Sequence, residues 1–249
     1  MIIYFDESYD RPHRYLLLGT LYVPGSRGFN RRLLAIKNRH RATAPGHTFS
    51  DMKYSRAGDR YVSAACRDAV DLFVQSNCFF RCVVVDTQMP AFSWSYFGGP
   101  ATPGALRKAY AYNKFAERLL SFNLGTISRA VLLADWLTRT PGNNFVQYVG
   151  TTFGPTVGPN LTQVHPRIRH VQQVDTRLEQ YQVGQVCDIL LGVVLGDLVP
   201  PLNPNKLALI SHTKTALRIS SFGPGFWQRY PKYILDTKFP KFQVWHWCP

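Results

Sequence analysis

The chain has 249 residues, of which 45% are hydrophobic, and it carries a formal net charge of +14. This hydrophobic content is typical of a folded globular protein and excludes an intrinsically disordered chain. The excess of 29 Lys and Arg over 15 Asp and Glu favours a polyanionic partner, most simply nucleic acid. An anionic membrane surface is the alternative, but no basic amphipathic helix is apparent that would serve it.

The cysteines and the apolar runs indicate the compartment. Five cysteines are present, none of them in a Cys-x-x-Cys pair, which favours free thiols in a reducing environment. The chain opens with an acidic strand rather than a basic leader. The longest apolar run, 189–199, is interrupted by Asp197 and is too short to span a bilayer. We therefore expect a soluble cytoplasmic protein without a membrane segment.

The first half of the chain predicts a β-hairpin followed by alternating helices and strands. Strands are expected over 2–6 and 15–23, and their short polar connection implies antiparallel pairing. The elements expected next are a helix over 29–41, an extended segment over 48–53, a helix over 59–76, a strand over 78–86, a Pro/Gly-rich loop over 89–104 and a helix over 105–122.

The second half continues the alternation as far as Leu198. The elements expected there are a strand over 128–135, a helix over 143–151, a Pro/Gly-rich loop over 152–166, a strand over 168–175 and a buried helix over 180–198. The residues after Pro200 are expected to be irregular, basic and aromatic.

These elements predict an α/β protein with a mixed sheet that opens with an antiparallel hairpin and has helices on both faces. We expect one domain over residues 1–199 and a basic aromatic extension over 200–249. Whether the extension packs on that domain is left open.

Three aspartates stand in apolar surroundings. Asp6 ends the first strand, Asp135 follows the apolar run 131–134, and Asp188 lies among apolar residues of the last long helix. A buried carboxylate costs several kcal/mol unless a metal, a cation or a catalytic role compensates it. For Asp135 alone, a helix cap or a surface salt bridge is the simpler interpretation.

Together the three acids predict a metal site. Carboxylate oxygens are the hard ligands that suit Mg²⁺ or Mn²⁺. Two such ions about 4 Å apart would hold the attacking and leaving oxygens of a displacement at phosphorus. A basic protein with acids in its core therefore suits an enzyme that acts on phosphodiesters.

An ordered set of short motifs supports this interpretation. The set comprises Asp6-Glu7-Ser8 at the end of the first strand, Asp51-Met52-Lys53 before the first long helix, Val131–Asp135, Val174-Asp175-Thr176, and Gly184-Gln185-Val186-Cys187-Asp188. In order and spacing these motifs resemble the RNase-H-like family catalogued as domain of unknown function 3800, over residues 1 to about 196. Three mild departures from the family pattern are Tyr9, Asp51 and Cys187.

The resemblance implies an RNase-H-like fold and a metal-dependent nuclease site. It makes Asp6, Asp135 and Asp188 the metal ligands and catalytic acids, with Mg²⁺ or Mn²⁺ as the cofactor. It also implies roles for further residues: Glu7 and Asp51 as additional ligands or supports of the ligands, Lys53 on the scissile phosphate or on a carboxylate, Gln185 as an orienting or substrate-binding group, and Asp175 as a contributor at its strand end. From its position after a strand, Ser8 either bonds a carboxylate or phosphate, or forms a turn.

The favoured hypothesis is a metal-dependent nuclease, or a nucleic-acid strand-transfer enzyme that uses the same chemistry. The alternative is a non-catalytic nucleic-acid-binding or assembly subunit that retains the fold. A third, weaker option is that the basic tail docks on another macromolecule within a larger assembly. DNA, RNA and a hybrid are all open as substrates, as are a protein partner and a homo-oligomer.

Overall fold

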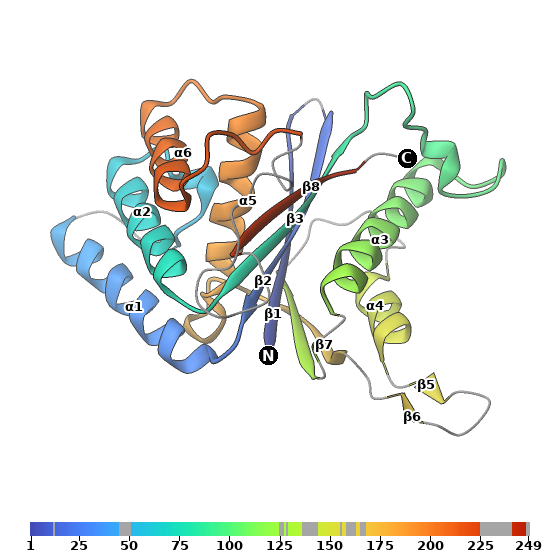
Figure 1. The fold of residues 1–249 in the computed structure, drawn as a ribbon, viewed down its shortest axis with the longest axis horizontal. Coiled ribbons are helices and arrows are strands. Elements are labelled where there is room, and N and C mark those ends of the chain that lie inside the picture. The colour runs from blue at the N-terminus through green and yellow to red at the C-terminus, as the bar shows by residue number, and fades with distance from the viewer. Residues whose placement is uncertain are drawn as a thin grey trace.

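A six-stranded mixed sheet separates two groups of helices (Figure 1). The computed structural model describes residues 1–249 except 12, 45–50, 125–126, 128, 136–143, 155, 158–162, 165–167, 225–240 and 248–249. The expected extended segment 48–53 therefore lies partly outside the described residues.

The strand order of the sheet is β7-β4-β1-β2-β3-β8. Its strands are β1 (Ile2–Tyr9), β2 (Tyr15–Val23), β3 (Phe79–Asp86), β4 (Ala130–Asp135), β7 (Ile168–Val174) and β8 (Phe242–His246). Strand β2 is antiparallel to β1 and β3, whereas the other neighbouring strands are parallel. This confirms the mixed sheet with an opening hairpin, and the arrangement is consistent with an RNase-H-like fold.

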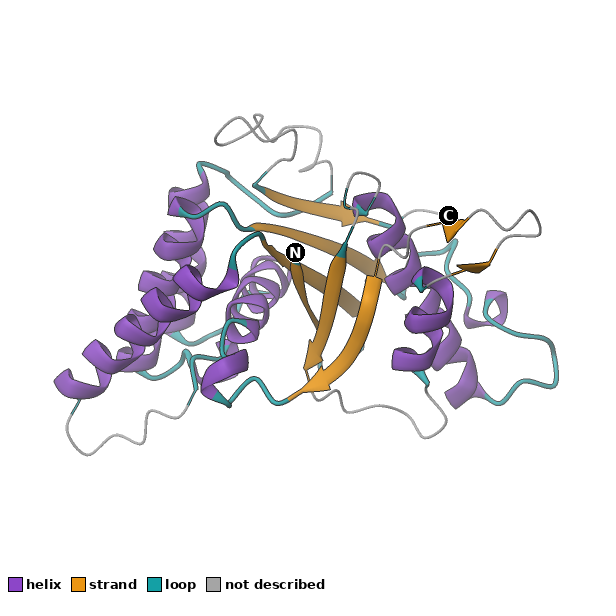
Figure 2. Ribbon diagram, turned by 90° about the horizontal axis from the view of Figure 1, so that it is seen from below, coloured by secondary structure: helices purple, strands orange, loops and turns teal. Residues whose placement is uncertain are grey.

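Helices cover both faces of the sheet, as Figure 2 shows from below. One face carries α1 (Ser26–Thr43), α2 (Arg60–Gln75), α5 (Gly184–Leu198) and α6 (Pro204–Leu217), and the other carries α3 (Gly104–Asn123) and α4 (Phe145–Phe153). Short 3-10 turns are η1 (Tyr54–Arg56), η2 (Trp94–Tyr96) and η3 (Glu179–Tyr181). Among the helices that the structure describes, none is long and apolar enough to cross a membrane.

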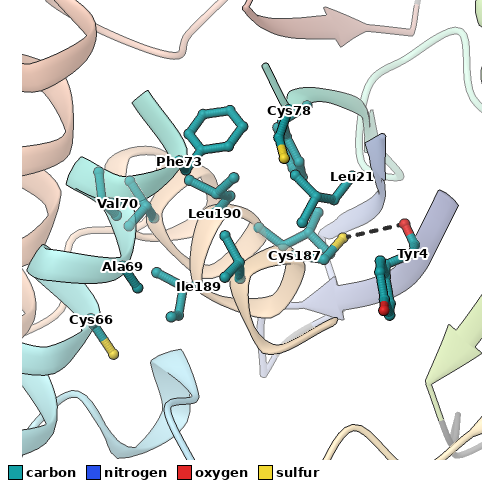
Figure 3. Close-up of a cluster of buried hydrophobic side chains, with 14 of the residues drawn as sticks. Tyr4, Leu21, Cys66, Ala69, Val70, Phe73, Cys78, Cys187, Ile189 and Leu190 are labelled. Carbon is teal, nitrogen blue, oxygen red and sulfur yellow. Dashed lines mark hydrogen bonds between the residues drawn. The ribbon is translucent and has the colours of Figure 1, made fainter. Parts of the chain in front are cut away.

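Helix α5 is the most buried of the described helices, because apolar residues surround it on nearly every side. Leu190 packs towards Phe73 of α2, and Cys187 faces Tyr4 of β1 (Figure 3). The Cys187 thiol donates a weak hydrogen bond to the Tyr4 carbonyl oxygen at 3.8 Å. The four cysteines in the described residues are free, as predicted, and all four are buried, whereas Cys248 lies outside those residues.

Two glycines allow neighbouring elements to approach α5 closely. A Cβ atom on Gly19 of β2 would lie 2.7 Å from Cδ2 of Leu191. A Cβ atom on Gly192 would lie 2.1 Å from Cγ of Tyr54 in η1. Neither glycine position has room for a side chain. The two contacts bring β2 and η1 close to the part of α5 that carries Asp188.

The expectation of an irregular tail is wrong for 204–217 and 242–246, which form α6 and β8. Asn203 caps α6, since its side chain accepts hydrogen bonds from the backbone N–H groups of Asn205 and Lys206. Pro204 then occupies the first turn, where a missing N–H costs nothing. Strand β8 pairs with β3, so the extension packs on the domain and shares its sheet.

A second difference concerns the expected loop 152–166. The short strands β5 (Thr156–Val157) and β6 (Gln163–Val164) form an antiparallel pair within it. Two residues per strand give too little periodicity for a prediction from sequence.

We predict that Gly192→Ala lowers the free energy of unfolding by about 1–3 kcal/mol, because the new methyl group overlaps the Tyr54 side chain close to its backbone. The control is Gly150→Ala in α4, where a Cβ atom would have no neighbour within 4 Å. That change should stabilise the protein by up to about 1 kcal/mol through helix propensity. Urea unfolding measures both variants, and equal effects would contradict the close contact.

Candidate functional site

Asp6 and Asp135 lie side by side on one face of the sheet. Phe5 of β1 is in register with Ala134 of β4, so the two aspartates that follow are neighbours. Side chains alternate along a strand, and Tyr4, two residues before Asp6, belongs to the core under α5. Both aspartates therefore project towards α5, which contributes Asp188.

The three carboxylates act on one another electrostatically. Burial raises the pKa of Asp6 well above its ordinary value, and the charges of Asp188 and Asp135 raise it further. Burial also raises the pKa of Asp188 to about 6, although the hydrogen bond from the Tyr54 N–H and the charge of Lys53 oppose this shift. The cluster thus holds mutually repelling carboxylates, two of them buried and Asp188 half-buried, where a cation is favoured.

Lys53 supplies a positive charge to the cluster. Its Nζ donates to Oδ2 of Asp135 at 3.0 Å. Burial lowers the pKa of Lys53, but this hydrogen bond and the charges of Asp135, Asp188 and Asp6 outweigh that effect, so the pKa is raised overall. Of the two roles predicted for Lys53, the structure shows the contact with a carboxylate.

Gln185 connects two segments that contact the acids. Its Oε1 accepts from the Met52 backbone N–H at 2.9 Å, and its Nε2 donates to the Thr176 carbonyl oxygen at 2.8 Å. The side chain is fully buried. Gln185 therefore orients the segment that carries Lys53 rather than facing a substrate.

Two partners of the acids were missed from sequence. Thr176 donates from Oγ1 to Oδ2 of Asp135 at 2.9 Å and from its backbone N–H to Oδ1 at 3.3 Å. The Tyr54 backbone N–H donates to Oδ2 of Asp188 at 2.6 Å. Alternation along β7 could have indicated Thr176, since Val174 faces the α5 core, whereas no side-chain pattern reports a backbone donor.

Asp51 and Asp175 each form an ion pair with a nearby arginine. Oδ1 of Asp51 accepts from Nη1 of Arg56 at 2.6 Å. Oδ2 of Asp175 accepts from Nη2 of Arg177 at 2.7 Å, and this guanidinium lowers the pKa of Asp175 to about 2. These acids surround the cluster, and each holds an arginine.

Glu7 and Ser8 follow Asp6 along β1 on alternate faces. Because Phe5 belongs to the core under α3 and α4, alternation places Glu7 on that face, away from Asp188. Ser8 lies on the same face of the sheet as Asp6, and it is in register with Leu17 of β2. Ser8 is therefore in a regular strand, not in a turn.

The donor chemistry of the cluster fits a hard divalent cation, but its present geometry does not. Within the residues that the structure describes, no group of three His, Cys, Asp or Glu side chains is arranged to hold a metal ion. Lys53 and Thr176 both contact Oδ2 of Asp135. Metal binding by the three aspartates would therefore require the Lys53 ammonium to move away from Asp135, and the Mg²⁺ or Mn²⁺ site stays a prediction.

No protein-family model matches the sequence, and no curated protein is significantly similar to it. The resemblance to the family of domain of unknown function 3800 therefore stays a prediction based on the motifs.

We predict that Asp188→Asn stabilises the metal-free protein at pH 7 by about 1–2 kcal/mol, because it removes a charge that burial disfavours. Asparagine can still accept the hydrogen bond from Tyr54. The gain should shrink as the pH falls from 7 towards 4, since protonated Asp188 in the wild type carries no charge either.

Thermal unfolding in EDTA tests this prediction. The control is Asp71→Asn, which changes a more exposed acid paired with His212 on the helical layer. A fall in stability for Asp188→Asn, or a gain that does not depend on pH, would contradict the electrostatic account.

Proposed function

We propose that the protein is a metal-dependent nuclease that hydrolyses phosphodiester bonds of DNA or RNA at Asp6, Asp135 and Asp188. The observation that carries the proposal is the convergence of these carboxylates from β1, β4 and α5 beside Lys53. The net charge of +14 suits a nucleic-acid partner, and we further propose a cytoplasmic location.

Each side chain of the cluster has a chemical role in this proposal. Asp6, Asp135 and Asp188 would hold Mg²⁺ or Mn²⁺, which when bound supplies a water of lowered pKa and offsets charge on the leaving oxygen. The ammonium of Lys53 can hold a non-bridging phosphate oxygen next to the carboxylates. Thr176 orients the Asp135 carboxylate through its two hydrogen bonds.

The alternative is a nucleic-acid-binding or assembly subunit without catalysis. The contacts of Asp135 favour it, because Lys53 and Thr176 already donate two hydrogen bonds to Oδ2 of this carboxylate. In that case Lys53 would be a permanent structural cation that stabilises the buried acids.

The test is cleavage of labelled single-stranded DNA, duplex DNA, RNA and a DNA–RNA hybrid with Mg²⁺, Mn²⁺ or EDTA. We expect metal-dependent cleavage that falls at least about 100-fold in Asp6→Asn and Asp188→Asn, because each variant removes a charged ligand. The control Asp71→Asn should retain activity. Binding by the wild type without cleavage of any substrate would favour the alternative.

A further inference from the structure

Two exposed arginines stand beside the acid cluster. Arg56 ends η1, which begins directly after Lys53. Arg177 directly follows Thr176, which donates to Asp135. Both arginines therefore lie on backbone segments whose positions the contacts of the cluster already fix.

In both ion pairs the acid is the more buried partner and the guanidinium faces outwards. The Arg177 side chain is 68% exposed and its partner Asp175 is 26% exposed. The Arg56 side chain is 42% exposed and its partner Asp51 is 13% exposed. Arg177 uses Nε and Nη2 for Asp175, and a guanidinium has five N–H donors, so its outer edge can bind a second anion.

Charge effects place Arg177 close to the cluster. The hydrogen bond to Asp175 is the main cause that raises the pKa of Arg177, and the charges of Asp51 and Asp135 raise it further. The charge of Lys53 in turn contributes to the lowered pKa of Asp175. Arg177 thus lies within electrostatic reach of Asp135, and its partner Asp175 lies within reach of Lys53.

A nucleic-acid backbone needs positive charge next to the acid cluster in order to bind there. The cluster offers three carboxylates and one ammonium, so a phosphate that approaches it meets net repulsion. Arginine recognises phosphate by paired hydrogen bonds, and an acid that already holds the guanidinium reduces the entropy lost on binding. An exposed ion pair is itself weak, so sharing the guanidinium with phosphate costs little.

We infer that Arg56 and Arg177 bind backbone phosphates next to the scissile phosphodiester, and that Asp51 and Asp175 position these two guanidiniums. The inference rests on the proposed function, since it assigns substrate contacts to the same site. It gives Asp51 and Asp175 a role other than the metal-ligand or strand-end roles that the motifs suggested.

The test is the binding of a fluorescently labelled 20-nucleotide DNA, and of the RNA of the same sequence, over a series of KCl concentrations in EDTA. We expect Arg177→Gln and Arg56→Gln each to weaken binding and to reduce the slope of log Kd against log salt by about 0.7, as for one lost phosphate contact on a single strand. Arg177→Lys keeps the charge and should keep most of the slope.

The matched control is Arg14→Gln. Arg14 forms the same two-pronged pair with Asp86, whose side chain is also 26% exposed, and the charges that act on Arg14 come from groups outside the acid cluster. We expect Arg14→Gln to leave the slope unchanged. In steady-state cleavage with Mg²⁺, the two site variants should raise KM more than they lower kcat, because phosphates next to the reacting one bind the ground and transition states alike.

The outcomes separate this inference from the proposed function. If the wild type binds and cleaves but Arg56→Gln and Arg177→Gln match Arg14→Gln, the inference is wrong and the nuclease proposal stands. If the wild type neither binds nor cleaves any substrate, both are wrong. A reduced slope in the two site variants but not in Arg14→Gln, with melting temperatures within a few degrees of wild type, supports the inference.

Discussion

The close approach of α5 to the sheet is the contact on which the candidate site depends. Leu191 packs where Gly19 of β2 has no side chain, and this packing sets the height of the helix above β1. Asp188 lies one turn before Leu191, so the same contact brings its carboxylate towards Asp6. Apolar burial around α5 supplies the free energy that holds like charges together, because each fully buried Leu, Ile or Val contributes roughly 1.5–3 kcal/mol.

Repulsion between the carboxylates of the cluster, and their burial, destabilise the fold, and the neighbouring groups offset this destabilisation only in part. Lys53 neutralises one charge, and Thr176 and the Tyr54 N–H donate hydrogen bonds, yet the pKa of both Asp6 and Asp188 stays raised. Natural proteins tolerate such local conflicts mainly at functional sites. Asp10 shows the contrast, because a buried acid in the hairpin simply accepts the Tyr15 N–H and caps a turn.

The three acids could be located from the sequence because their signal is local. A carboxylate that follows an apolar strand, or interrupts an apolar helix, can be recognised without knowing which strands pair. Sequence reasoning missed Thr176 as a partner because that role depends on which strand lies beside β4. It missed β8 for the same reason, since pairing with β3 joins residues far apart in the chain. Helix α6 is different, because its start signal, Asn203-Pro204, is local and can be recognised in the sequence without knowledge of the fold.

Gln185 holds together the two segments that contact Asp135. By bonding Met52 on one side and Thr176 on the other, it fixes the relative positions of the two groups that contact Asp135. Lys53 contacts Asp135 through a long side chain, so a rotamer change can remove this contact while the Met52 and Thr176 contacts of Gln185 stay in place. The nuclease and the non-catalytic alternative therefore share every backbone contact of the site. They differ in whether a divalent cation can displace one ammonium from one carboxylate.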